Sequence, residues 1–132
     1  MTASETSRKT VLIAEDENDL REALVTALKT IGDYEVISVA DGEAALAESL
    51  AHKPDHIILD IHMPKLNGDK VLEELRKDAW GKDVTVTILT AQSDMAAIAS
   101  ALEAGGAGTG YLVKSDISLA KVVEHVGQQL RS

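Results

Sequence analysis

The chain has 132 residues and a formal net charge of −9. This length fits one domain with a substantial core, and the absence of cysteine excludes disulfide bonds and thiolate metal sites. No apolar stretch approaches the ~20 residues of a membrane span, and the start does not resemble a signal peptide, so we expect a cytoplasmic protein that does not enter a membrane. The acidic balance argues against direct nucleic-acid binding and favours a partner with a basic face.

Strand-like and helix-like segments alternate five times along the chain. Residues 1–9 are polar and are predicted to form a disordered tail, followed by one domain over residues 10–131 and no effector domain. The predicted strands are 11–14, 34–39, 57–60, 84–90 and 111–113, and the predicted helices are 20–31, 42–50, 68–75, 94–104 and 119–130. The alternation predicts an α/β fold with a single five-stranded parallel sheet and helices on both faces. For such a sheet we expect the (βα)5 flavodoxin-like arrangement with strand order 2-1-3-4-5, one of the common orders of doubly wound folds.

Charged side chains follow three of the predicted strands. Glu15 and Asp16 come after the first strand, Asp60 ends the third, and Lys114 follows the fifth. The carboxyl ends of parallel strands meet at one edge of the sheet, where ligands bind. Three carboxylates there would repel each other unless a cation were present. Mg²⁺ suits the site, with Mn²⁺ as the alternative ion, because it binds carboxylates and water without Cys or His.

Each candidate residue also has a structural interpretation. An acidic pair such as Glu15 and Asp16 is favourable at the start of the next helix, and Lys114 could be an ordinary surface lysine. Thr90 ends the fourth strand, where threonine is common, although its hydroxyl could instead bond to a phosphoryl oxygen. Tyr111 could be a half-buried core aromatic. The predicted position of Asp60 beside Glu15 and Asp16 favours a functional site over these structural explanations.

The chain resembles a response-regulator receiver domain over residues 10–131. The resemblance rests on segments 13–17, 58–64, 67–68, 89–91 and 111–114. It implies that Asp60 accepts a phosphoryl group from a sensor histidine kinase or a histidine phosphotransfer protein. It also implies that Asp16 and Asp60 bind the metal directly, that Glu15 binds it through water, and that the backbone carbonyl of His62 is a further ligand.

The resemblance assigns further residues to phosphate binding and switching. These are Lys114, Thr90, Ala91 and Tyr111, whose ring would turn inward after phosphorylation. The side chains of His62 and Gln92 lie where they could adjust the lifetime of the phosphoryl group. The surface that would change for a downstream protein comprises the helix at 94–104, the strand at 111–113 and the last helix.

The leading functional hypothesis is a stand-alone receiver, either a monomer or a dimer that forms on phosphorylation. Such a domain is a signalling module and not an enzyme, apart from slow self-catalysed transfer and hydrolysis. The first alternative is a receiver-like interaction module that is never phosphorylated. The second is a Mg²⁺-dependent phosphatase of similar fold, which loses its usual chemistry because His62, and not an aspartate, stands two residues after Asp60.

The sequence departs from the family pattern in two places. Ser115 stands where the family usually has proline, which leaves the Lys114–Ser115 bond cis or trans and puts the direction of Lys114 in question. Four glycines between residues 105 and 110 predict a loose, slightly extended loop beside the output surface. Two other expectations are that His125 faces solvent and that Trp80 lies far from the strand ends that form the site.

Overall fold

The central element of the fold is a five-stranded parallel sheet with the order β2-β1-β3-β4-β5. The computed structural model describes residues 8–91, 94–106 and 108–131. The strands are β1 (Thr10–Ala14), β2 (Glu35–Val39), β3 (His56–Asp60), β4 (Thr85–Thr90) and β5 (Thr109–Val113). The predicted fold class and strand order are confirmed.

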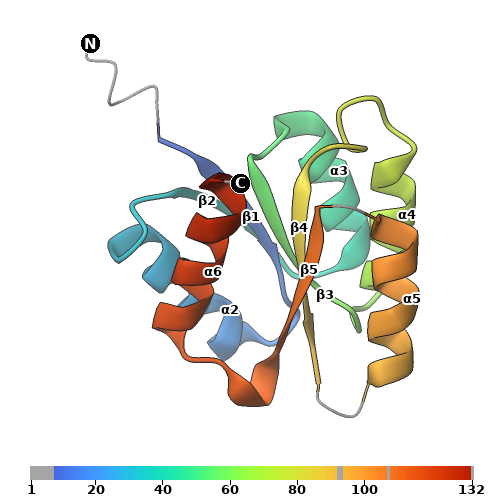
Figure 1. Ribbon diagram of the computed structural model, residues 1–132. Coiled ribbons are helices and arrows are strands. Elements are labelled where there is room, and N and C mark those ends of the chain that lie inside the picture. The colour runs from blue at the N-terminus through green and yellow to red at the C-terminus, as the bar shows by residue number, and fades with distance from the viewer. Residues whose placement is uncertain (1–7, 92–93, 107, 132) are drawn as a thin grey trace.

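Helices cover both faces of this sheet. Figure 1 shows α2 and α6 on one side and α3, α4 and α5 on the other. Their bounds are α2 (Asn18–Thr30), α3 (Gly42–His52), α4 (Gly68–Arg76), α5 (Met95–Gly105) and α6 (Leu119–Arg131), with a short 3₁₀ turn η1 (Lys114–Asp116) before α6. Within the described part of the chain, no helix is long and apolar enough to cross a membrane.

Alternation along the strands divides the core into two clusters. Val11 and Ile13 pack toward α2 and α6, whereas Leu12 and Ala14 pack toward α3, α4 and α5. All residues of β3 are buried, as expected for a central parallel strand covered on both faces. The two buried clusters hold the strand ends in a fixed relative position.

The strand register brings the predicted site residues to one edge of the sheet. Ala14 of β1 pairs with Leu59 of β3, so the next residues along the two strands, Glu15 and Asp60, lie at the same level of the sheet. Further along the sheet, Asp60 pairs with Leu89, and Thr90 pairs with Val113. The carboxyl ends of β1, β3, β4 and β5 therefore converge, as the sequence predicted.

The glycine-rich stretch is shorter and better anchored than the predicted loose loop. Gly105 belongs to α5 and Gly110 to β5, which leaves only residues 106–108 between the two elements. The Arg76 guanidinium donates to the carbonyl of Gly105 at 2.9 Å and to Thr109 Oγ1 at 3.1 Å. A basic side chain from α4 thus fixes both ends of this connection, which the glycine content did not indicate.

The prediction that His125 faces solvent is wrong. Its Nε2 lies 3.0 Å from Thr87 Oγ1, and Thr87 is fully buried in β4. The same hydroxyl is 2.8 Å from Nε2 of buried His56. His125 belongs to the apolar stripe of α6, three residues after Val122, and this helical spacing turns it toward the sheet.

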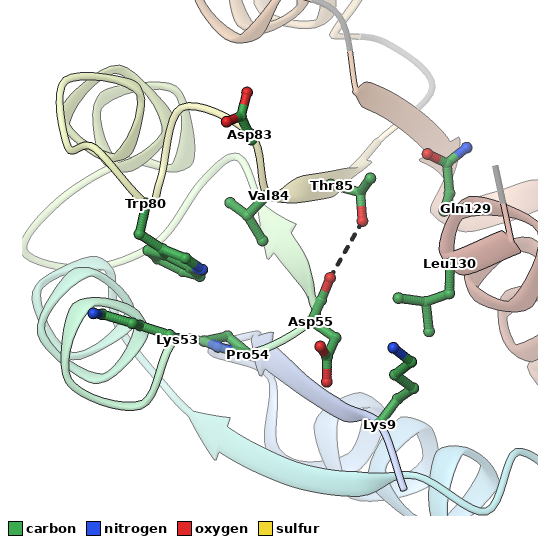
Figure 2. Close-up of a pocket in the computed structure, with 10 residues that line it drawn as sticks. All are labelled: Lys9, Lys53, Pro54, Asp55, Trp80, Asp83, Val84, Thr85, Gln129 and Leu130. Carbon is green, nitrogen blue, oxygen red and sulfur yellow. Dashed lines mark hydrogen bonds between the residues drawn. The ribbon is translucent and has the colours of Figure 1, made fainter. Parts of the chain in front are cut away.

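Trp80 lies at the amino ends of the strands, as predicted. Figure 2 shows it beside Lys53 and Pro54, with Asp55 and Thr85 nearby. These residues line a hollow of about 330 Å³. Asp55 directly precedes β3 and Thr85 begins β4, so this hollow is at the opposite end of the sheet from Asp60. Indole fluorescence therefore reports on the end of the domain remote from the candidate site.

Candidate functional site

Lys114 lies against two buried carboxylates at the carboxyl edge of the sheet. Its Nζ donates to Asp60 Oδ2 at 2.9 Å and is also 2.9 Å from Glu15 Oε1. Asp60 is 4% exposed and Glu15 is 0% exposed. The contact with Glu15 is an ion pair without hydrogen-bond angles, so Glu15 Oε1 is a buried oxygen with no hydrogen-bond partner. One ammonium group therefore faces two carboxylates and leaves acceptor capacity unused.

Asp16 completes an acidic cluster with these two residues. One carboxylate oxygen from each of Glu15, Asp16 and Asp60 lies within 4.8 Å of the others, and Asp16 is exposed. The cluster has three negative charges against the single positive charge of Lys114. Hard oxygen donors on two buried side chains and one exposed side chain fit a hydrated divalent cation such as Mg²⁺. The predicted carboxylate ligands are thus close enough to bind one ion.

Burial dominates the protonation behaviour of the phosphoacceptor candidate. The pKa of Asp60 is raised from 3.8 to about 6. Burial is the largest cause, the hydrogen bond from Lys114 opposes it, and the negative charge of Glu15 also raises the pKa. Burial alone would lower the pKa of Lys114, but its pairing with Asp60 and Glu15 outweighs burial and raises it. At neutral pH the site consequently holds an ionised Asp60 beside a protonated Lys114.

Two residues that the sequence analysis did not assign to the site shape its backbone. Arg21 of α2 donates to the backbone carbonyl of Glu15 at 2.8 Å and thereby fixes the turn after β1. Gly68 begins α4, where a Cβ atom would lie 2.2 Å from the Asp60 carbonyl oxygen. Glycine is therefore required for α4 to approach β3 this closely. The Asn67–Gly68 pair was visible in the sequence, whereas the contact of Arg21 depends on how α2 packs.

Among the residues predicted for phosphate binding and switching, Lys114 contacts Asp60 directly, whereas the Thr90 hydroxyl has a different partner. Thr90 is 1% exposed, and its Oγ1 donates to the carbonyl of Ala91 at 3.2 Å. Ala91 is exposed, and Tyr111 on β5 is 42% exposed. Gln92 lies outside the described residues. Thr90 must therefore exchange its present partner if it is to bond to a phosphoryl oxygen.

The segment after Asp60 contacts the start of α5. The backbone N–H of His62 is 3.4 Å from Asp60 Oδ1, and its imidazole Nε2 hydrogen bonds to Asp94 Oδ2. The His62 side chain is thus engaged with Asp94, while its backbone carries the contact to Asp60. Asp94 stands at the N-cap position of α5.

The serine after Lys114 does not disturb the site. None of the peptide bonds in the described ranges is cis, so the bond between Lys114 and Ser115 is trans. Lys114 begins η1, and its ammonium group still reaches Asp60. The question that Ser115 raised about the direction of Lys114 is therefore answered by the observed contact.

The fold and the acidic site together define a flavodoxin-like α/β domain with a candidate metal site at the carboxyl ends of its strands. Residues 11–126 match the response regulator receiver domain family, and the chain belongs to this family. Receiver domains of this kind act in two-component signalling, so the recognition based on the sequence motifs is confirmed.

Relatives and solved structures agree with this assignment. A probable transcriptional regulator ycf27 from Cyanophora paradoxa is 41% identical over 110 residues, which cover 83% of this chain and 44% of the relative. A putative response regulator from Chloroflexus aurantiacus has a TM-score of 0.85 and 32% identity, with 96% of this chain and 100% of that chain covered. The chain spans less than half the length of this curated relative.

A third similar protein has a metal ion in its structure. The receiver domain of the sensor histidine kinase PA1611 from Pseudomonas aeruginosa has a TM-score of 0.84 and 26% identity, covering 96% of this chain and 100% of that one. Its structure contains a magnesium ion coordinated in the active-site cleft. This agrees with the presence of an acidic group in the present chain that could hold a metal.

Proposed function

We propose that Asp60 accepts a phosphoryl group from a phosphohistidine on a sensor histidine kinase or histidine phosphotransfer protein. In this transfer the P–N bond to the partner's imidazole breaks and a P–O bond to the Asp60 carboxylate forms. The observation that carries the proposal is the buried, ionised Asp60 with the Lys114 ammonium group 2.9 Å from its Oδ2. A carboxylate held beside a positive charge at the mouth of the sheet is a suitable phosphoryl acceptor.

Electrostatic stabilisation is the main task of the chain's own residues in this reaction. Phosphoryl transfer passes through a loose transition state, so positioning and charge neutralisation matter more than covalent assistance. Lys114 supplies a positive charge to the phosphoryl oxygens, and Thr90 supplies a hydroxyl donor after transfer. Glu15, Asp16, Asp60 and the His62 carbonyl would hold Mg²⁺, which adds positive charge next to the phosphoryl oxygens when bound.

Signalling, and not turnover of a substrate, is the expected consequence. The acyl phosphate would be hydrolysed slowly by the domain itself, and its charge would alter the surface formed by α5, β5 and α6. Met95 of α5 is 62% exposed and Tyr111 of β5 is 42% exposed, so apolar groups are available there for a downstream protein. The stand-alone mode, the monomer-to-dimer choice, the absence of direct nucleic-acid binding and the cytoplasmic location stay predictions.

Magnesium is expected to raise the melting temperature through the acidic cluster. A ligand that binds only the folded state adds about 1.4 kcal/mol to the free energy of unfolding at ten times its Kd. Asp16→Asn should lose most of the temperature shift, whereas Lys114→Ala should keep it because the three carboxylates remain. Thermal unfolding at increasing MgCl₂ concentration, at constant ionic strength, measures the effect.

Asp19→Asn is the matched control for this measurement. It removes an exposed carboxylate from the first turn of α2, outside the acidic cluster, and should retain the full magnesium shift. An equal loss in Asp16→Asn and Asp19→Asn would mean that magnesium acts on general surface charge. No shift in the unaltered chain would contradict the proposed site.

A further inference from the structure

A hydrogen bond joins the phosphoacceptor segment to the first residue of the α5 region. His62 Nε2 donates to Asp94 Oδ2, although the two residues are 32 positions apart in the sequence. The His62 side chain is 62% exposed and that of Asp94 is 29% exposed. The pair therefore forms a bridge between the loop that follows β3 and the start of α5.

Asp94 stands at the N-cap position of α5 but does not cap the helix with its side chain. Its φ and ψ are −103° and 43°, outside the extended region that N-cap residues normally adopt, and its carboxylate makes no cap hydrogen bond. Asp41 provides an internal comparison at the start of α3. It is extended, with φ −148° and ψ 167°, and its Oδ1 accepts from Ala44 N at 2.8 Å. The bond to His62 thus occupies a carboxylate that is suited to capping.

The same pair is linked to Thr90 through one carbonyl group. The Asp94 backbone N–H donates to the Ala91 carbonyl at 3.1 Å, and Thr90 Oγ1 donates to that carbonyl at 3.2 Å. The Ala91 carbonyl therefore accepts hydrogen bonds from both the Asp94 backbone and the Thr90 hydroxyl. The backbone of Asp94 therefore connects the His62 contact to the hydroxyl group that phosphorylation must recruit.

We propose that Asp94 is a positioning residue with two alternative partners. In the unmodified protein it binds His62, and this bond keeps the Ala91 carbonyl and the Thr90 hydroxyl in their present arrangement. In the phosphorylated protein Asp94 releases His62 and caps α5 through the backbone N–H of Ala97, the position equivalent to Ala44 in α3. The competition sets how readily Thr90 moves to the phosphoryl group. This inference rests on the proposed function of Asp60.

The competition predicts an energetic coupling between His62 and Asp94. The probe is beryllofluoride, a phosphoryl analogue, added with Mg²⁺ while the amide resonances of the protein are followed. His62→Ala should lower the half-saturating concentration about two- to fivefold, the range expected for loss of an exposed ion pair. In an Asp94→Ala background the same His62→Ala change should have no effect, because neither the bond to His62 nor the cap can form.

Hydrogen exchange of the metal-free protein gives a second readout that does not require phosphorylation. His62→Ala should slow exchange of the Ala97 amide, because Asp94 becomes free to cap α5. Asp94→Ala should not slow it, with or without His62→Ala. A merely structural ion pair would leave the Ala97 amide unprotected in every variant.

The outcomes separate this inference from the proposed function. If beryllofluoride binds the unaltered chain but His62→Ala shifts its half-saturation equally in both backgrounds, or not at all, the two-partner role of Asp94 is overturned and the phosphoacceptor role of Asp60 stands. If His62→Ala does not slow exchange at Ala97, the two-partner role is likewise overturned. If beryllofluoride does not bind the unaltered chain, both the proposed function and the role of Asp94 are overturned.

Discussion

Acidification from pH 6.5 to about pH 3 is expected to lower the free energy of unfolding by about 5 kcal/mol through His56 alone. Burial lowers the pKa of His56 from 6.5 to about 3, and the nearby His125 contributes in the same direction. Its ring nitrogens are bound to two hydroxyl groups, Thr85 Oγ1 at 2.7 Å and Thr87 Oγ1 at 2.8 Å. These groups satisfy a neutral imidazole but provide no negative charge for an imidazolium.

The direction of this pH effect follows from the difference in bound protons between the unfolded and the folded state. Between pH 6.5 and about pH 3 the unfolded chain carries a proton on His56 and the folded chain does not. The unfolded state is therefore favoured progressively as pH falls through this window. The effect is absent above pH 6.5 and complete below about pH 3, where both states are protonated.

Urea unfolding at a series of pH values measures this dependence. His56→Gln keeps an amide donor and acceptor near the two threonines but cannot bind a proton, so its stability should fall less steeply than that of the parent below pH 6.5. His52→Gln removes an exposed histidine that pairs with Glu48 and controls for the loss of an imidazole outside the core. Carboxylates contribute equally to all three proteins and cancel in the comparison. Parallel curves for the parent and His56→Gln would contradict the assignment.

Asp60→Asn is expected to raise the free energy of unfolding of the metal-free protein at pH 7 by about 3 kcal/mol. Burial raises the pKa of Asp60 from 3.8 to about 6, and the opposing hydrogen bond from Lys114 does not restore the ordinary value. The folded protein consequently binds this proton more tightly than the unfolded chain does. The stability associated with the neutral carboxyl group is present below pH 3.8 and is lost as pH rises through about 6.

An asparagine at this position mimics the neutral carboxyl group at every pH. The difference in stability between Asp60→Asn and the parent should therefore be largest at pH 7 and should shrink as the pH is lowered toward 4. Denaturant unfolding with a chelator present measures it. Asp55→Asn is a suitable control, because Asp55 lies at the opposite end of β3 and accepts a hydrogen bond from Thr10 N at 2.8 Å. A destabilised Asp60→Asn protein would contradict the conclusion that burial disfavours the ionised carboxylate in the folded, metal-free protein.

The sequence predicted those parts of the site that depend on strand order alone. Asp60 and Lys114 each stand at or just after the end of an apolar run, and parallel strands bring such positions to one edge. Lys114 reaches Asp60 even though Ser115 replaces the usual proline, because the pairing of β5 with β4 already fixes the backbone position of Lys114. Backbone topology therefore determined the placement of these groups.

Contacts that depend on how a helix packs were not predicted. Arg76 reads as an ordinary basic residue near the end of α4, yet its guanidinium also donates to the carbonyls of Gly81 and Val84 at 2.6 and 2.7 Å. Similarly, the bond between His62 and Asp94 forms only because two loops come close together, and no local sequence pattern predicts that proximity. A helical-spacing argument applied to α6 would have directed His125 toward the sheet.

Intact mass after incubation with a small acyl phosphate tests the central claim most directly. The parent chain and Asp60→Asn are compared with and without Mg²⁺, and circular dichroism confirms that both proteins are folded. We expect an adduct of one phosphoryl group on the parent in the presence of Mg²⁺, and none on Asp60→Asn. A folded parent that gains no adduct, or an adduct that persists in Asp60→Asn, would contradict the account and favour an interaction module that is never phosphorylated at Asp60.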